Sequence, residues 1–194
     1  SQIIVDLKND GAKVRPIRNM AGGEDFNEVV FDNVLVPKDR IVGAPGNGWQ
    51  QVTSELAYER SGPERFLSSF RVFVELVRIC GDDPSPHQAA AIGRIASHFM
   101  TLRRMSLSVA GMLEAGKDVS VEAALVKELG NNFEKLLPEI ARLVVPDLSA
   151  VDPDKQRLFR ETFEETLMLS PSFTLRGGTR EIMRGVIARG LGLR

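Results

Sequence analysis

Two short segments of the chain carry the residue types that could do chemistry, and the first lies near the C-terminus. There Gly177 and Gly178 directly precede Thr179. Adjacent glycines let backbone N–H groups come close to a ligand, and threonine is a good N-cap for a helix. A helix N-terminus offers unpaired N–H donors and partial positive charge. This segment is therefore predicted to face an anionic ligand.

The segment after Thr179 is predicted to be an amphipathic, basic helix. Its apolar residues recur at helical spacing, and they are Ile182, Met183, Val186, Ile187 and Leu191. Arg180, Arg184 and Arg189 make the same segment strongly basic. For Arg180 and Arg184 we expect solvated or salt-bridged surface positions.

The second candidate is Glu59, because a positioned carboxylate can act as a general base. It lies between Tyr58 and Arg60, and Pro63 follows four residues later. Proline lacks an N–H and clashes with the preceding helical turn, so a kink or break is expected beside Glu59. Such an irregularity leaves room for a ligand. The alternative, which the residue types alone favour, is an ordinary helix end with Glu59 in water.

Metal and disulfide chemistry have little support in this sequence. Cys80 is the single cysteine, which excludes an intrachain disulfide and a multi-cysteine metal site. His87 and His98 stand eleven residues apart without a third clustered ligand. We therefore expect no metal centre, and structural rather than catalytic roles for both histidines.

Net charge and hydropathy restrict the classes of molecule that this chain is expected to bind. The chain has 25 basic and 26 acidic residues among 194, a net charge of −1, so no overall field attracts nucleic acid or an anionic membrane. The apolar runs fall far short of the ~20 residues that span a bilayer, and no signal-peptide pattern opens the chain. We expect a soluble, cytoplasmic protein with no nucleic-acid partner and no membrane span.

Residues 1–45 are predicted to form three or four short strands. β-Branched and aromatic residues cluster there between turn-forming residues, in the runs Gln2–Leu7, Lys13–Ile17, Phe26–Phe31 and Val34–Pro37. So few strands cannot close a barrel, and an open sheet leaves edge N–H and C=O groups unpaired. We expect residues 1–45 to be part of a larger β-domain, completed by the rest of a longer protein or by another chain.

Residues 46–194 are predicted to form a helical bundle. After Asn47, a plausible cap, the apolar period changes from two to about 3.6. One long amphipathic helix runs through residues 92–112 and a second through residues 120–145, with a short link between them that favours an antiparallel pair. A weaker helix over 155–167 and a loop at 170–172 follow. The expected fold is mainly α, with an antiparallel four-helix-bundle-type domain.

Three segments resemble motifs of the acyl-CoA dehydrogenases, and they occur in the order that this family has. They are Val14–Ile17 with Phe26–Pro37, Gly48–Arg60, and Gly177–Arg189. The resemblance covers nearly the whole chain. It implies the C-terminal portion of a protein with a helical N-terminal domain, a central β-domain and a C-terminal four-helix bundle.

The resemblance implies a flavin-dependent chemistry with a glutamate as base. In the family, a glutamate removes the α-proton of an acyl-CoA thioester while the β-hydrogen leaves as hydride to N5 of FAD. One position for this glutamate is immediately before Gly-Thr in the terminal motif, where this chain has Gly177. The other is on the first bundle helix before an arginine, where this chain has Glu59 before Arg60. The implied base is Glu59, and the implied role of Gly177 is to donate its backbone N–H to the thioester carbonyl.

The same resemblance assigns other residues to ligands. Thr179 and Glu181 match positions that contact the flavin nucleotide, and Gln88 lies near a position that reaches a flavin across the dimer interface. Arg60 and Arg189 are the implied substrate-binding residues, with Arg189 near the coenzyme A moiety. The implied partners are the acyl-CoA substrate, an electron-transfer flavoprotein, and further subunits of a homo- or hetero-oligomer.

Two departures from the family pattern leave the function open. An Arg-x-x-Phe-Gly element is replaced by the sequence that begins at Arg78, and a Leu-Gln-x-x-Gly-Gly-x-Gly segment is absent between Val145 and Ser170. The chain in this respect is similar to bacterial members that pair two unlike subunits. The alternatives are therefore a dehydrogenase with Glu59 as base, a non-catalytic or flavin-deficient subunit of a hetero-oligomer, and an oxidase relative. The isolated chain is expected to be inactive and to bind flavin weakly or not at all.

Overall fold

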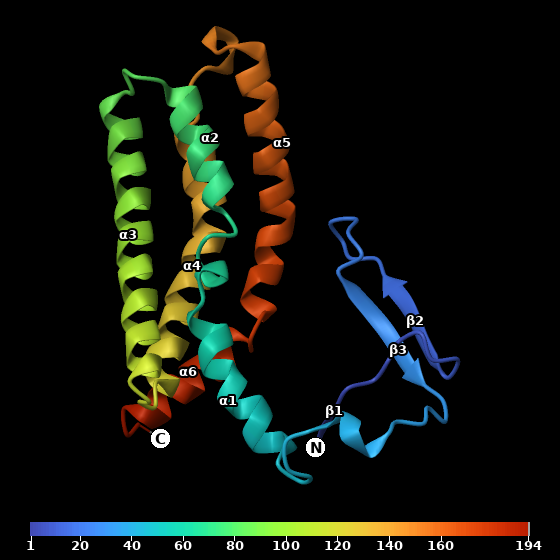
Figure 1. The fold of residues 1–194 in the computed structure, drawn as a ribbon. Helices are drawn as coiled ribbons and strands as arrows, with labels where there is room; N and C mark the ends of the chain where they lie inside the picture. Colours follow the sequence, from blue (N-terminus) through green and yellow to red (C-terminus); the bar gives the residue numbers. More distant parts are fainter. Residues whose placement is uncertain (194) are drawn as a thin grey trace. The chain divides into compact units, whose positions relative to one another are not determined.

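The structure is a computed structural model that describes residues 1–193 (Figure 1). Its contacts divide the chain into two compact units, residues 1–56 and the residues from Ala57 onward. The division falls inside helix α1, which spans Gly48–Ser61, and not between residues 45 and 46, where the change of apolar period lies. The end of α1, with Glu59, belongs to the second unit.

The first unit contains two separate two-stranded sheets. Strand β2 (Ala12–Ile17) pairs with β3 (Phe26–Phe31), and β1 (Gln2–Ile3) pairs with β4 (Ile41–Val42), both antiparallel. The predicted strand over residues 34–37 is wrong, because this stretch has no partner strand and leads into a 3-10 turn, η1, at Lys38–Arg40. The first strand is also much shorter than the predicted 2–7.

The hairpin of β2 and β3 buries none of its large side chains. Apolar residues remain 40 to 58% exposed on it, namely Val14, Ile17, Phe26, Val29, Val30 and Phe31. A two-stranded hairpin by itself is marginally stable in water. Within residues 1–45 neither sheet closes on itself.

The second unit is an antiparallel bundle of four helices (Figure 1), as predicted. They are α2 (Phe70–Cys80), α3 (Pro86–Glu114), α4 (Ser120–Val144) and α5 (Pro153–Leu169). The predicted loop at 170–172 is instead part of a 3-10 segment, η4, over Ser170–Leu175. The last helix, α6 (Arg180–Gly190), packs against α4.

Helix α4 lies at the centre of the bundle and contacts α2, α3, α5 and α6. Its apolar residues join one core cluster with residues from its neighbours, among them Phe66, Leu76, Ile95, Phe99, Phe133 and Leu137. Helical spacing predicts Leu129 and Leu136 on the same apolar stripe as Phe133, but both leucines are half exposed. In their place the helix buries three polar side chains, those of Lys127, Asn131 and Glu134.

Local sequence signals account for the helix ends that frame the site. Helix α1 ends at Ser61, and Pro63 begins a 3-10 turn, η2 (Pro63–Arg65), so the break expected beside Glu59 is present. Ser85 caps α3 through a capping box with Gln88. Among residues 1–193, no helix has the length and apolar character that crossing a membrane requires.

Candidate functional site

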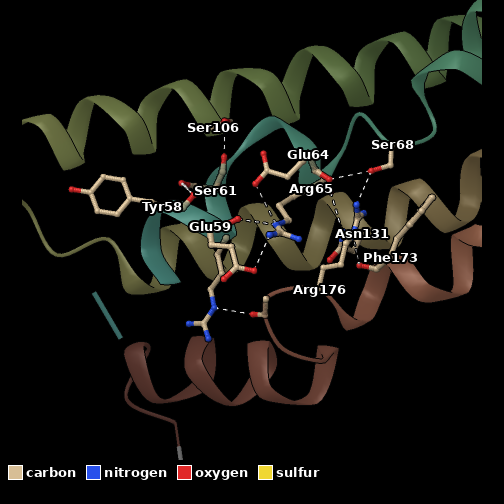
Figure 2. A network of polar contacts seen from close by, with 12 residues as sticks. Tyr58, Glu59, Ser61, Glu64, Arg65, Ser68, Ser106, Asn131, Phe173 and Arg176 are labelled. Carbon is tan, nitrogen blue, oxygen red and sulfur yellow. Dashed lines mark hydrogen bonds and ion pairs between the residues drawn. The ribbon is translucent and has the colours of Figure 1, made fainter. Parts of the chain in front are cut away.

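Glu59 is held at the end of α1 by an arginine that follows the helix break (Figure 2). Arg65 donates from Nε to the main-chain oxygen of Glu59 at 2.7 Å and from Nη2 to its Oε1 at 2.9 Å. The Arg65 side chain is 5% exposed and that of Glu59 43%, so the cation is buried while the carboxylate stays accessible. Pro63 ends the helix, and the chain then turns Arg65 back onto Glu59.

The Gly177–Gly178 turn lies against the Glu59 carboxylate. Both glycines have positive φ, +67° and +103°, a backbone conformation that favours glycine. A Cβ with ideal geometry on Gly177 would lie 3.0 Å from Oε1 of Glu59. Arg60 donates from Nε to the main-chain oxygen of Gly177 at 3.1 Å. The fold therefore brings Glu59, Arg60 and the Gly-Gly turn together from distant parts of the sequence.

Lys127 approaches the same turn from α4. Its side chain is fully buried, and Nζ donates to the main-chain oxygen of Thr174 at 3.4 Å. Its Cε lies 3.6 Å from the ideal Cβ position on Gly177. Burial, followed by the positive charge of Arg65, lowers the pKa of Lys127 to about 8. Periodicity did not point to this residue, since a lysine in an amphipathic helix is usually solvated.

Glu134, two turns further along α4, anchors the segment that leads into the turn. Its carboxylate accepts from the Ser68 backbone N–H at 2.7 Å, from Asn131 Nδ2 at 3.0 Å and from Arg176 Nη2 at 2.9 Å. Burial raises the pKa of Glu134, and the bonds from Ser68 and the charge of Arg176 oppose that rise. The guanidinium of Arg176 also lies 4.6 Å from the ring centre of Phe173.

Gly130 allows α4 to come close to η2. A Cβ on Gly130 would overlap the main-chain oxygen of Arg65, and the neighbouring Asn131 donates from Nδ2 to that same oxygen at 3.2 Å. The glycine therefore fixes how near the buried polar residues of α4 lie to Arg65. An isolated glycine inside a helical pattern often has such a packing reason, and this is the signal in the sequence that indicates the contact.

Thr179 and Glu181 lie together at the start of α6. Thr179 is the N-cap residue, as predicted, but its hydroxyl makes no capping hydrogen bond. Glu181 is exposed in the first turn, and hydrogen bonding to its own backbone and then to Thr179 lowers the pKa of its carboxyl group. The two predicted flavin-contacting residues are thus next to the Gly-Gly turn.

The arginines of α6 divide into two groups. Arg180 contacts Glu128 of α4 through Nη2 at 2.9 Å and Nε at 3.1 Å, and Arg184 contacts the same carboxylate at 3.1 Å. These are the salt-bridged positions predicted for them. Arg189 is exposed in the last turn of α6. Nine residues separate it from Arg180, so it lies roughly 14 Å from that residue along the helix axis.

Gln88 is not brought near Glu59. Its Oε1 accepts from the Ser85 backbone N–H at 2.9 Å, and its Nε2 donates to the main-chain oxygen of Val144 at 3.1 Å. On the same helix, Ser106 is the residue that reaches the end of α1, with a 2.6 Å bond to the Ser61 carbonyl. Eighteen helical residues separate Gln88 from Ser106, about 27 Å. Gln88 is therefore at the other end of the bundle.

Comparisons by sequence and by fold relate the chain to known proteins. No protein-family profile matches the chain. The acyl-CoA dehydrogenase IpdE1 of Mycobacterium tuberculosis is 32% identical over 205 residues, which cover 100% of this chain and 50% of IpdE1. The solved structure of the Tcur3481-Tcur3483 steroid ACAD matches 99% of this chain and 51% of its own, with a TM-score of 0.80 at 20% identity. The ChsE4-ChsE5 complex from M. tuberculosis matches 99% and 52%, with a TM-score of 0.75 at 23% identity.

The matches agree on the share of their own length that this chain covers. The chain spans about half the length of IpdE1 and about half of each of the two solved chains. The matched fold, a helical bundle preceded by a few short strands, is the one that the structure shows. In sequence and in fold, the chain is similar to a C-terminal portion of the acyl-CoA dehydrogenases.

Proposed function

We propose that this chain carries the catalytic base of a flavin-dependent acyl-CoA dehydrogenase, an enzyme that introduces a double bond between the α and β carbons of an acyl-CoA thioester. Glu59 is the base. The observation that carries this proposal is the position of its carboxylate, with Oε1 3.0 Å from the ideal Cβ position on Gly177. The similarity to IpdE1, named an acyl-CoA dehydrogenase, supports the class of reaction.

The α-proton of a thioester is weakly acidic, so its removal needs a positioned carboxylate and hydrogen bonds to the carbonyl oxygen, where negative charge develops. The Glu59 carboxylate, held by Arg65 at 2.9 Å, takes this proton. The backbone N–H of Gly177 donates to the thioester oxygen, a role that needs no side chain. The electron pair of the α C–H bond becomes the new double bond.

A bound FAD supplies the acceptor for the β-hydrogen, which leaves with its electron pair as hydride. The residues at the start of α6 fit such a group, because the Gly177–Gly178 turn carries no side chain and the Thr179 hydroxyl makes no capping bond. In this proposal Thr179 and Glu181 hold the flavin nucleotide. Gln88 remains a predicted flavin contact that the present hydrogen bonds of its amide do not favour.

Arginines of the second unit are suited to the anionic coenzyme A portion of the substrate. Arg189 is exposed and forms no ion pair among the described residues, so its guanidinium is available to a phosphate. Arg60 uses Nε for Gly177 and has further donors for the thioester end. We propose an acyl-CoA substrate, an electron-transfer flavoprotein that takes the two electrons, an oligomeric assembly and a cytoplasmic location.

The test compares Glu59→Gln with Glu55→Gln in the native flavin-loaded protein that contains this chain. Glu55 is the matched control, since it lies one turn earlier on α1 and is exposed. After anaerobic mixing with acyl-CoA, we expect Glu59→Gln to slow flavin reduction by about 10²- to 10⁴-fold, the usual contribution of a general base. Flavin reduction at the wild-type rate in Glu59→Gln, at equal flavin content, contradicts the proposal.

A second function has one observation in its favour, the engagement of both ends of the Gln88 amide within the chain. If that glutamine only caps α3, this chain is a flavin-deficient or non-catalytic subunit of a hetero-oligomer. A structure that resembles this chain, that of ChsE4-ChsE5, is a complex of two proteins. The ratio of FAD to each chain in the purified native complex distinguishes the two. One FAD for every copy of this chain contradicts the second function, and FAD carried by a partner chain alone supports it.

A further inference from the structure

The side chain of Lys127 is a buried charge without an ion-pair partner. It is fully inaccessible to solvent, and among residues 1–193 no carboxylate forms an ion pair with it. The nearby cations of Arg65, Arg60 and Arg176 disfavour its charge further, whereas the carboxylate of Glu128 favours it. Buried lysines in proteins are almost always paired, because desolvating an ammonium group is costly. Packing alone does not explain a lysine at this position.

The geometry places this ammonium beside the turn of the candidate site. Nζ donates to the main-chain oxygen of Thr174 at 3.4 Å, and Cε lies 3.6 Å from the ideal Cβ position on Gly177. Glu59 reaches the same glycine from α1. A carboxylate from one helix and a lysine side chain from another therefore both approach the side of Gly177 on which a Cβ would lie.

Other contacts already hold the backbone before and at the turn. Arg176 is bonded to Glu134 and to the Ser68 hydroxyl, at 2.9 and 3.0 Å, and Arg60 is bonded to the Gly177 carbonyl. Lys127 adds a bond from Nζ to the Thr174 carbonyl, three residues before Gly177, at 3.4 Å. It also adds positive charge in a region that solvent does not screen.

We propose that Lys127 is a positioning residue for the thioester site, which braces the Thr174–Gly177 backbone and places a positive charge beside the N–H of Gly177. The inference rests on the proposed function, in which that N–H donates to the thioester oxygen. A cation near this donor stabilises the negative charge that develops on the oxygen during proton removal. Lys127 acts through the backbone and does not itself touch the substrate.

The proposal gives the reaction a defined pH dependence. The charged groups that act on Lys127 are Arg60 on α1, Arg65 on η2, Glu128 on α4 and Arg176. The Glu59 carboxylate approaches the same ideal Cβ position on Gly177 as Lys127 does. Because the pKa of Lys127 is about 8, the ammonium is present at neutral pH and is lost as the pH rises through that value. The rate of flavin reduction falls with it.

The experiment measures single-turnover flavin reduction by acyl-CoA in the native flavin-loaded protein between about pH 6 and about pH 10. Lys127→Met is expected to be about tenfold slower than wild type at neutral pH, with substrate affinity changed less than about threefold and with no decline near pH 8. Lys127→Arg keeps a charge that does not titrate, so it is expected to retain the neutral rate and to lose the alkaline decline. Lys135→Met, exposed on the same helix, is the control and should match wild type.

A second measurement does not depend on turnover. Amide hydrogen exchange at Gly177 is expected to be about tenfold faster in Lys127→Met than in Lys135→Met, since the brace beside the turn is removed. If Glu59→Gln is inactive and Lys127→Met keeps both the wild-type pH profile and the wild-type exchange rate, the role of Lys127 is overturned. If Glu59→Gln stays fully active, the proposed function itself fails, and the two failures are thereby distinguished.

Discussion

The carboxylate of Glu59 lies in the space that a side chain at Gly177 would enter, with Oε1 3.0 Å from the ideal Cβ position. Glu59 lies in the last turn of α1, and Gly177 lies in the turn that leads into α6. Either of two backbone positions can therefore deliver a carboxylate to one point in this fold. In this chain the α1 position carries it, and the glycine leaves the room that it needs.

Gly177→Ala is expected to destabilise the protein by more than ~1–2 kcal/mol, since a non-glycine residue at positive φ alone costs that much and the added methyl group also crowds Glu59. Gly116→Ala measures the loss of stability due to the positive φ alone, because Gly116 has a similar φ of +69° and nothing within 4 Å of its ideal Cβ position. Denaturant unfolding measures both. The Gly177 variant should be the less stable, and Glu59→Ala in that background should recover the difference. Equal losses in the two single variants exclude the crowding.

Lys127→Met is expected to raise the free energy of unfolding at neutral pH by ~1–3 kcal/mol, because it removes a buried, unpaired charge. The folded state releases the lysine proton near pH 8 and the unfolded state near its ordinary value of 10.5. Between these values the unfolded state binds more protons, so the stability of the wild type rises with pH. Below pH 8 the full cost of the buried charge is present.

Urea unfolding of wild type and Lys127→Met across this pH range tests whether the wild type gains stability relative to the variant as the pH rises. The advantage of the methionine variant should shrink as the pH rises from about 8 towards 10.5 and should vanish above it. A methionine variant that is less stable than wild type at neutral pH contradicts a buried ammonium at this site. A methionine variant that is both more stable and slower would show that Lys127 lowers the stability of the wild type and supports its reaction.

Glu134→Ala is expected to cost about 3–5 kcal/mol, because it leaves the Arg176 guanidinium and the Ser68 N–H without their buried partner. A double-mutant cycle with Arg176→Ala should give a coupling energy of ~1–3 kcal/mol. The exposed pair of Arg142 and Glu139 is the control, with an expected coupling below ~1 kcal/mol. Coupling energies of the same size for both pairs would show that burial does not strengthen the Glu134 contact.

Gln88→Ala is expected to lower stability by ~1 kcal/mol, since Gln88 completes the capping box of α3 and also bonds the Val144 carbonyl. Ser85→Ala removes the other half of the same box and should have a similar effect. Thermal unfolding and FAD content are measured on both variants. Loss of FAD in Gln88→Ala, but not in Ser85→Ala, would show that Gln88 binds the cofactor. An unchanged FAD content in both variants would show that Gln88 only caps α3.

Local patterns in the sequence predicted the parts of this protein that depend on a few neighbouring residues. Pro63 ended α1 next to Glu59, the apolar period marked α3 and α4, and Thr179 marked the start of α6. Each signal acts through bonds or clashes within a turn or two, so it needs no knowledge of distant segments. The strand over residues 34–37 was mispredicted because a strand also needs a partner, which neighbouring residues do not reveal.

Only the tertiary structure decided which charged residues surround the candidate site. Arg65, Lys127 and Glu134 follow patterns typical of solvated positions, yet α4 has neighbours on several sides and buries them, while Leu129 on the same helix stays half exposed. Hydrophobic periodicity describes a helix with one buried face, whereas burial depends on how many elements pack around it. The sequence by itself therefore determined the residues of the motifs and the helices that carry them. The packing of α4 against η2 and α6 decided which cations and carboxylates lie beside Gly177.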